Sequence, residues 1–363
     1  GNINSVIKFK LFIPHTKRGD NEVFSAALLE ELGYLAPRTY HVDAIFNGLK
    51  TEFLFQEKIT KEFIESNNLR EAPLLEGDER FLFLNDTIGF DRFGLARILN
   101  NKWAEKGNTS LNISTTALRQ LNKVYLDYLS GKHISKNQRD RLLSTPNYYI
   151  GNSNLERSKA FASIVLAMGA AHALRPHNRS FYYDPIYKEF LPIYYDGNST
   201  ITTLSENSTL EKFIRYGDRL SQDEIEGSEY GLKVLKNIDR KSFHKKLKNL
   251  GLNFELDEVD IILDRVSANL ISIRDSSISD QKVDLGVPYF SNYKDFEDNN
   301  LKRLAFSSEK KSNVEICDLS LKSCYQNIFN VRDYSKLLEG RYSDDTDNSY
   351  IFVGEKKEYI DGI

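Results

Sequence analysis

Residues 190–198 read FLPIYYDGN, a short apolar strand that ends in an Asp-Gly pair. A second short strand precedes it within HNRSFYYDP, residues 177–185, and the two strands predict a hairpin. Asn178 and Asp196 flank this hairpin and supply an amide and a carboxylate, the oxygen ligands that magnesium prefers. Gly197 allows a sharp turn after Asp196. The pattern therefore predicts a magnesium site held by Asn178 and Asp196.

The segment before this hairpin carries further candidates. Residues 158–174 are small and apolar, which predicts a helix that is buried on all sides. His172, at its end, can serve as a proton acceptor, because an unperturbed histidine has a pKa of about 6.5, or it is a core histidine without a chemical role. Arg175 and Arg179 can bind a phosphate through paired hydrogen bonds, or they pair with nearby acids.

The amino-terminal part predicts a small sheet that carries one helix. Lys8 and Lys10 fall on one face of its first strand, and Glu22 opens the helix. The Asn47-Gly48 pair is typical of a hairpin turn. The predicted elements are a strand at 6–13, a helix at 22–32, strands at 38–46 and 51–56, and a helix at 60–67.

Protein kinases have this order of elements. In kinases a strand lysine holds the nucleotide phosphates and pairs with a helix glutamate, while a loop asparagine and a later Asp-Gly hold the metal ions. We therefore expect an α+β, bilobal, protein-kinase-like fold. Its small sheet-plus-helix N-lobe would cover residues 1–58, and its larger, mainly helical C-lobe residues 59–363.

The same stretches carry a family resemblance. The chain resembles the CotH-like kinases, an atypical kinase family named after a spore coat protein. The resemblance implies a kinase-like fold, binding of ATP with Mg²⁺ or Mn²⁺, and transfer of a phosphoryl group, often to protein. The matching stretches are KFKLFIP (8–14), NEVFSAALLEELGYLAPRTYHVDAIFNG (21–48), FLFQEKITKEFI (53–64), HNRSFYYDP (177–185) and FLPIYYDGN (190–198).

The resemblance also implies a role for individual residues. Asp196 matches the metal-binding aspartate, and Asn178 matches the second metal-binding position. The phosphate-binding lysine corresponds to Lys10 or else Lys8, with Glu22 as its helix partner. The residues that would border the adenine, where the chain crosses between the lobes, are Glu57 and Lys58.

Two features depart from the kinase pattern. Kinases of this type have an aspartate about five residues before the metal-binding asparagine, and here that position is Ala173, beside His172. The chain also opens directly into the lysine strand, so the first N-lobe strands and a glycine-rich loop precede it or are missing. Three functions stay open: phosphoryl transfer to a protein Ser/Thr or a carbohydrate hydroxyl, a nucleotide-binding pseudokinase scaffold, and transfer of AMP.

The composition limits the classes of partner that the protein is expected to bind. The 363 residues carry a formal net charge of −3, and this near balance favours neither nucleic acid nor an anionic membrane surface as a partner. The longest apolar stretch, 160–173, is too short to span a bilayer. Residues 90–101 and 114–129 predict helices, and the tail after Asp318 predicts a helix and one strand. Cys317 and Cys324 either close a disulfide loop or are separate thiols.

Overall fold

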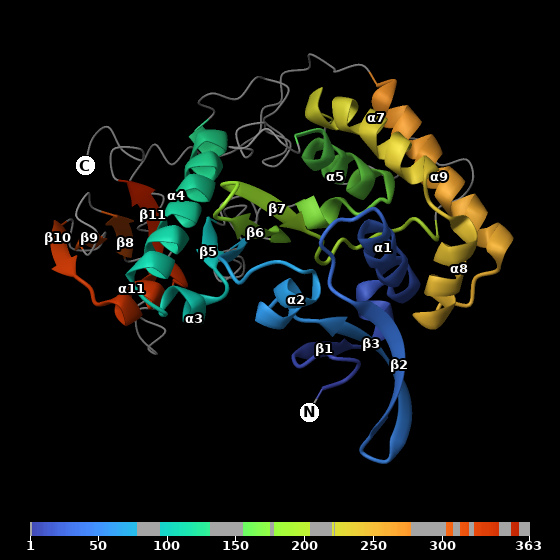
Figure 1. Cartoon of the computed structure of the whole chain (residues 1–363), viewed down its shortest axis with the longest axis horizontal. Helices are drawn as coiled ribbons and strands as arrows, with labels where there is room; N and C mark the ends of the chain where they lie inside the picture. The colour runs from blue at the N-terminus through green and yellow to red at the C-terminus, as the bar shows by residue number, and fades with distance from the viewer. Residues whose placement is uncertain are drawn as a thin grey trace. The chain divides into compact units, whose positions relative to one another are not determined.

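The structure is a computed structural model (Figure 1). The chain forms two compact units. Unit 1 comprises Gly1–Arg70, Lys136–Arg175 and Leu191–Asp280, and unit 2 comprises Glu71–Ser135, Pro176–Phe190 and Gln281–Ile363. Both contain helices and strands, in keeping with an α+β chain. The residues that the structure describes are 2–77, 95–130, 155–174, 178–203, 220, 222–276, 303–307, 313–318, 323–340 and 350–355.

Unit 1 contains a three-stranded antiparallel sheet in the order β1-β3-β2. A hairpin joins β2 to β3 through Asn47 and Gly48, whose positive φ angles of 50° and 81° fit the preference of this pair for such a turn. Pro14 opens the short 3-10 helix η1, which leads into α1. The elements are β1 (Phe9–Phe12), η1 (Pro14–Lys17), α1 (Gly19–Glu31), β2 (Thr39–Phe46), β3 (Leu49–Glu57) and α2 (Lys61–Ser66).

The remaining helices of unit 1 pack against one another and share a hydrophobic core with α1. Figure 1 shows α5, α7 and α9 side by side. Gly227 lies where α7 meets α5: a Cβ there would collide with the backbone of Lys159, so the glycine permits this close approach. The elements are α5 (Leu155–Ala167), the 3-10 helix η6 (Ala171–Leu174), α7 (Gln222–Lys236), α8 (Arg240–Asn249) and α9 (Leu256–Arg274).

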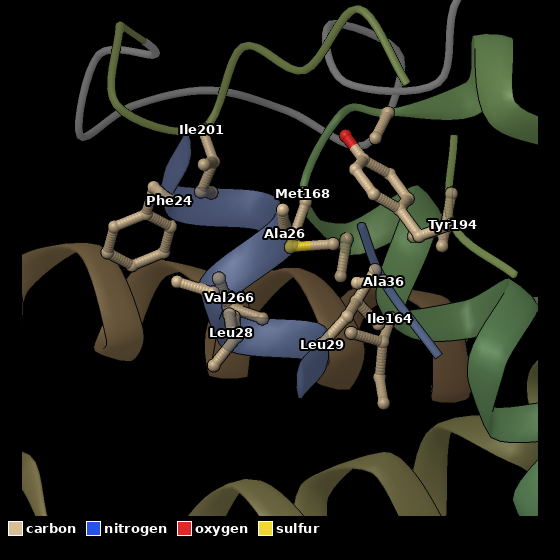
Figure 2. Close-up of a cluster of buried hydrophobic side chains, with 14 of the residues drawn as sticks. Phe24, Ala26, Leu28, Leu29, Ala36, Ile164, Met168, Tyr194, Ile201 and Val266 are labelled. Carbon is tan, nitrogen blue, oxygen red and sulfur yellow. The ribbon is translucent and has the colours of Figure 1, made fainter. Parts of the chain in front are cut away.

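Helix α1 lies in the middle of the unit 1 core, and residues 21–29 along it are all buried. Figure 2 shows its side chains among those of α5 and α9. Each fully buried side chain of the size of leucine or phenylalanine stabilises the fold by about 1.5–3 kcal/mol. The labelled members of this core are Phe24, Ala26, Leu28, Leu29, Ala36, Ile164, Met168, Tyr194, Ile201 and Val266.

Unit 2 contains two further sheets. One has the order β5-β4-β6-β7, and the last residues of β7, from Leu191, belong to unit 1. The other has the order β10-β9-β8-β11, with β8 and β11 parallel. Helix α4 packs against β11, α3 and α11 (Figure 1). The elements are β4 (Leu74–Gly77), β5 (Ala96–Ile98), α3 (Asn101–Ala104), α4 (Asn108–Ser130), β6 (Ser180–Asp184), β7 (Glu189–Ile193), β8 (Arg303–Ser307), β9 (Asn313–Asp318), β10 (Ser323–Ile328), α11 (Val331–Leu338) and β11 (Tyr350–Glu355).

Two predictions for this part of the chain were wrong. The helix predicted at 90–101 is replaced, where the structure describes it, by strand β5, because Ala96–Ile98 pairs with β4. The tail after Asp318 contains β10 besides the predicted helix and strand, and this short strand is stabilised by its pairing with β9. The described part of residues 59–363 contains strands β4 to β11 as well as helices. The boundary at residue 58 stays a prediction.

The two cysteines form a disulfide, which decides between the alternatives that the sequence left open. Cys317 on β9 lies directly opposite Cys324 on β10, so the hairpin register brings the two sulfur atoms together. Among the helices that the structure describes, none combines the length and the apolar character that crossing a bilayer requires.

Candidate functional site

The turn after β7 has an unusual backbone. Asp196 and Asn198 both adopt left-handed φ angles, 49° and 51°, which cost a residue with a Cβ atom about 1–3 kcal/mol. Gly197 between them is needed for space: a Cβ there would lie 2.7 and 2.8 Å from ring atoms of Tyr194. Strained residues of this kind cluster at functional sites, which makes this turn a candidate.

The Asp196 side chain meets a lysine that the sequence did not single out. The Lys17 ammonium lies 2.7 Å from Asp196 Oδ1, and the two side chains remain 25% and 20% exposed. His172 Nδ1 lies 2.8 Å from the Asp196 carbonyl oxygen and 4.0 Å from Oδ2. Because a carbonyl only accepts hydrogen bonds, Nδ1 carries a proton, and the neutral form of the ring therefore has its lone pair on Nε2.

Glu22 approaches the same turn from α1. Its carboxyl is buried, and Oε2 accepts a hydrogen bond of 3.0 Å from the Tyr194 hydroxyl. Burial, and then the nearby Asp196 carboxylate, raise the pKa of Glu22 to about 7, although Tyr194, Lys17 and the Gly197 backbone oppose the rise. Burial and Glu22 also raise the Tyr194 pKa well above its ordinary value. Glu22 is thus hydrogen-bonded to a tyrosine hydroxyl, and its predicted pairing with Lys10 or Lys8 stays a prediction.

The lysines of β1 differ in their surroundings. Lys10 donates a hydrogen bond of 2.7 Å to the Tyr195 hydroxyl, next to Asp196. The Lys10 ammonium also lies 5.2 Å from the centre of the Tyr195 ring and 5.9 Å from that of Phe12. Lys8 is exposed, and its carbonyl oxygen accepts a hydrogen bond from the Lys58 amide. Of the two, Lys10 is the one that the structure brings to the turn.

Glu57 and Lys58 lie at the end of β3. Glu57 is buried, and its two carboxylate oxygens accept hydrogen bonds of 2.9 and 2.8 Å from the Arg38 guanidinium. Lys58 is exposed. The Glu57 side chain thus ties β3 to the start of β2, and a contact with adenine at this position stays a prediction.

The remaining predicted residues lie elsewhere in the chain. Asn178 and Arg179 belong to unit 2, just before β6, and both are buried. The Arg179 guanidinium lies 5.1 Å from the centre of the Phe181 ring. Arg175 lies outside the described residues. The predicted pairing of Asn178 with Asp196 across the two units, and the phosphate roles of both arginines, therefore stay predictions.

Sequence reasoning missed Lys17, Tyr194 and Tyr195. The sequence contained one signal near Lys17, because Pro14 favours a turn. In the structure the chain does fold back at this lysine, with a left-handed φ of 54° at Arg18 before α1. The two tyrosines looked like ordinary strand residues. Their hydroxyl groups reach Glu22 and Lys10 only because β1 and α1 lie beside the end of β7.

Comparisons with known proteins give little guidance. No family model and no curated protein matches the chain. A solved chain from the Shewanella oneidensis MR-1 toxin–antitoxin system, in a complex of HipA, HipB and operator DNA, is similar with 14% identity and a TM-score of 0.33. The match covers 71% of this chain and 58% of that chain, less than two thirds of its length. A likeness at this level carries no argument about the fold or the function.

Proposed function

We propose that this chain is a kinase-like phosphotransferase that binds ATP with Mg²⁺ or Mn²⁺ and moves the γ-phosphoryl group to a hydroxyl. The observation that carries the proposal is the turn after β7. Asp196 there presents a partly exposed carboxylate beside the Lys17 ammonium and His172, and the Lys10 ammonium is hydrogen-bonded to the adjacent Tyr195. A carboxylate with nearby ammonium groups is the arrangement that a metal–phosphate complex needs.

The residues of unit 1 fit a divalent cation at Asp196. The carboxylate already accepts the positive charge of Lys17 at 2.7 Å, so this position favours a cation. Asp196 would hold the metal, with Asn178 as the second ligand that the family resemblance implies. When bound, the metal would supply charge neutralisation for the phosphate oxygens. Lys10 and Lys17 can stabilise the negative charge that these oxygens carry during transfer.

His172 is the proposed proton acceptor. Its Nδ1–H is held by the Asp196 carbonyl, which fixes the ring and leaves the lone pair on Nε2. That nitrogen can take the proton of an acceptor hydroxyl as the hydroxyl oxygen bonds to the γ-phosphorus, while the bond from this phosphorus to the bridging oxygen breaks and ADP leaves. The acceptor would be a protein Ser or Thr, or a carbohydrate hydroxyl, because the same chemistry serves both.

A second candidate, a nucleotide-binding scaffold without transfer activity, is favoured by two observations. Ala173, at the position of the expected aspartate, is 4% exposed and belongs to the hydrophobic core. Glu22 accepts a hydrogen bond from Tyr194, whereas the kinase pattern pairs this glutamate with a lysine. In this case Asp196 and the lysines would bind a nucleotide that is never cleaved.

Thermal unfolding with ATP, Mg²⁺ and Mn²⁺ tests the proposal. ATP with metal should raise the melting temperature of the wild type, equivalent to about 2.7 kcal/mol at a ligand concentration of 100 times Kd. Asp196→Asn should abolish the rise. Asp43→Asn is the matched control, because Asp43 forms an exposed ion pair of 2.9 Å with Lys50 on the β2–β3 hairpin.

Each outcome separates the candidates. Stabilisation that Asp196→Asn removes, together with a phosphorylated acceptor, supports the phosphotransferase. The same stabilisation without any transferred group favours the scaffold. The mass of a modified acceptor distinguishes phosphoryl from adenylyl transfer. If ATP and both metals leave the melting temperature of the wild type unchanged, every nucleotide-based function is contradicted.

A further inference from the structure

The backbone around Lys17 is fixed by its own hydrogen bonds. Helix η1 begins at Pro14, and the amide of Arg18 donates a hydrogen bond to the Pro14 carbonyl. Arg18 has a left-handed φ of 54°, after which Gly19 begins α1. The position of the Lys17 Cα atom is therefore set by this turn, while its long side chain keeps its own freedom to move.

The ion pair that this side chain makes is exchangeable. Lys17 and Asp196 are 25% and 20% exposed, so water reaches both groups of the pair. Ion pairs near the surface stabilise a protein by at most about 1 kcal/mol, because water solvates the separated charges well. A divalent cation can therefore compete with Lys17 for the Asp196 carboxylate at little cost to the fold.

A released Lys17 would stay near a second ammonium group. Its Nζ lies 5.3 Å from the centre of the Phe12 ring, and the Lys10 ammonium lies 5.9 Å from the centre of the same ring. Lys10 in turn holds the Tyr195 hydroxyl beside Asp196. Once Lys17 leaves the carboxylate, two positive charges border one aromatic ring, and no other salt bridge joins either lysine to a carboxylate of the described residues. This arrangement favours binding of a polyanion such as a phosphate chain.

We propose that Lys17 is an exchangeable cation at Asp196, which it neutralises until a divalent metal arrives and then leaves to bind the phosphates that come with the metal. This inference rests on the proposed function and assigns to Lys17 a role in how the site binds its substrate. A metal ion that binds without phosphate must displace Lys17 from Asp196, and the displaced lysine then has no phosphate to bind. Metal and phosphate together satisfy all the charges, so the two bind cooperatively.

Titrations of metal and nucleotide on matched variants test this role. Mn²⁺ alone, ATP alone and both together are titrated against thermal stability, and the Mn²⁺ affinity is also measured by calorimetry. In Lys17→Met no lysine competes with Mn²⁺ for the Asp196 carboxylate, so the affinity for Mn²⁺ alone should rise at least about fivefold. The cooperativity between Mn²⁺ and ATP should fall at least about fivefold. Lys17→Arg keeps the charge and should resemble the wild type.

The controls keep the inference distinct from the proposed function. Lys50→Met removes the lysine of the exposed Asp43 pair and should change neither affinity nor cooperativity. If Lys17→Met does not fold, Lys17→Gln replaces it with a neutral polar side chain. This inference alone is overturned if ATP with metal stabilises the wild type while the Lys17 variants keep the wild-type Mn²⁺ affinity and cooperativity. A wild type that responds to neither ligand overturns both proposals.

Discussion

Two clusters of unit 1 in which a lysine meets carboxyl groups use the lysine differently. Between α5 and α7, the Lys159 ammonium lies 3.0 Å from Asp223 and 2.5 Å from Glu226, and the side chains of Lys159 and Asp223 are only 12% and 3% exposed. At the turn after β7, Lys17 pairs with the partly exposed Asp196, and the buried carboxyl of Glu22 accepts a hydrogen bond from Tyr194.

The difference teaches which of the two clusters suits binding. Lys159 neutralises a buried carboxylate directly, so a ligand that displaced it would strand that charge inside the protein. Lys17 neutralises a carboxylate that water can reach, and Glu22 depends on Tyr194 for its hydrogen bond. The first arrangement holds two helices together, whereas the second can exchange its cation.

The largest effect should come from the helix contact next to Lys159. Gly227→Ala would drive a methyl group into the Lys159 backbone and to 2.6 Å from the Ala160 nitrogen. Alanine favours a helix over glycine by about 1 kcal/mol, so any loss of stability must come from this collision. We expect a loss of about 3 kcal/mol or more, measured by chemical denaturation.

Gly231→Ala on the same helix is the control for this substitution. Its methyl group would meet only side-chain atoms of Ile164 and Leu270, at 3.2 and 3.4 Å, and these can shift. It should change the free energy of unfolding by less than about 1 kcal/mol. Equal losses at the two glycines would show that α5 and α7 do not approach as closely as the structure has them.

The two clusters should also titrate over different pH ranges. Glu22 has an ordinary pKa of 4.5 that the fold raises to about 7, so the folded state binds its proton more tightly than the unfolded state. Its contribution to stability is complete below pH 4.5 and is lost as the pH rises through about 7. Burial raises the pKa of Asp223 from 3.8 to about 6, so its contribution is lost as the pH rises from 3.8 through about 6.

Glu22→Gln and Asp223→Asn test these two ranges. Because Gln and Asn do not titrate, each variant should lack the matching decline, by about 2–3 kcal/mol for Glu22 and about 2 kcal/mol for Asp223. Chemical denaturation of the wild type and both variants between about pH 4 and about pH 8 measures this decline, because that range covers both pKa shifts. A wild type and a Glu22→Gln variant with parallel pH profiles would contradict the raised Glu22 pKa.

The sharpest contrast, and at Lys17 the smallest effect, should come from removing each lysine charge. Lys159→Met leaves the buried Asp223 without its cation and should cost about 2–3 kcal/mol, less than a stranded charge because Asp223 can take up a proton. Lys17→Met leaves a partly exposed carboxylate and should cost less than about 1 kcal/mol. Thermal and chemical unfolding at neutral pH measure both. A larger loss for Lys17→Met would contradict its role as an exchangeable cation.

The sequence predicted much of the amino-terminal sheet. Alternating apolar residues and the Asn47-Gly48 turn placed β1, β2 and β3 within a few residues, because hairpin geometry depends on local turn chemistry. Strands β5 and β8 were not predicted, because strands this short depend on the neighbours they pair with. The Asp-Gly motif indicated a candidate site, but its main cation, Lys17, carried only a weak turn signal.

What the sequence by itself determined is the chemistry that the chain carries: a strand that ends in Asp196 and Gly197, a first-turn glutamate on α1, and lysines before that helix. These follow from local rules of strands, turns and helices. Only the tertiary structure decided the partners: Lys17 with Asp196, Tyr194 with Glu22, and Lys10 with Tyr195. Those pairs join residues far apart along the chain, and burial and distance, which set their charges, exist only once the chain has folded.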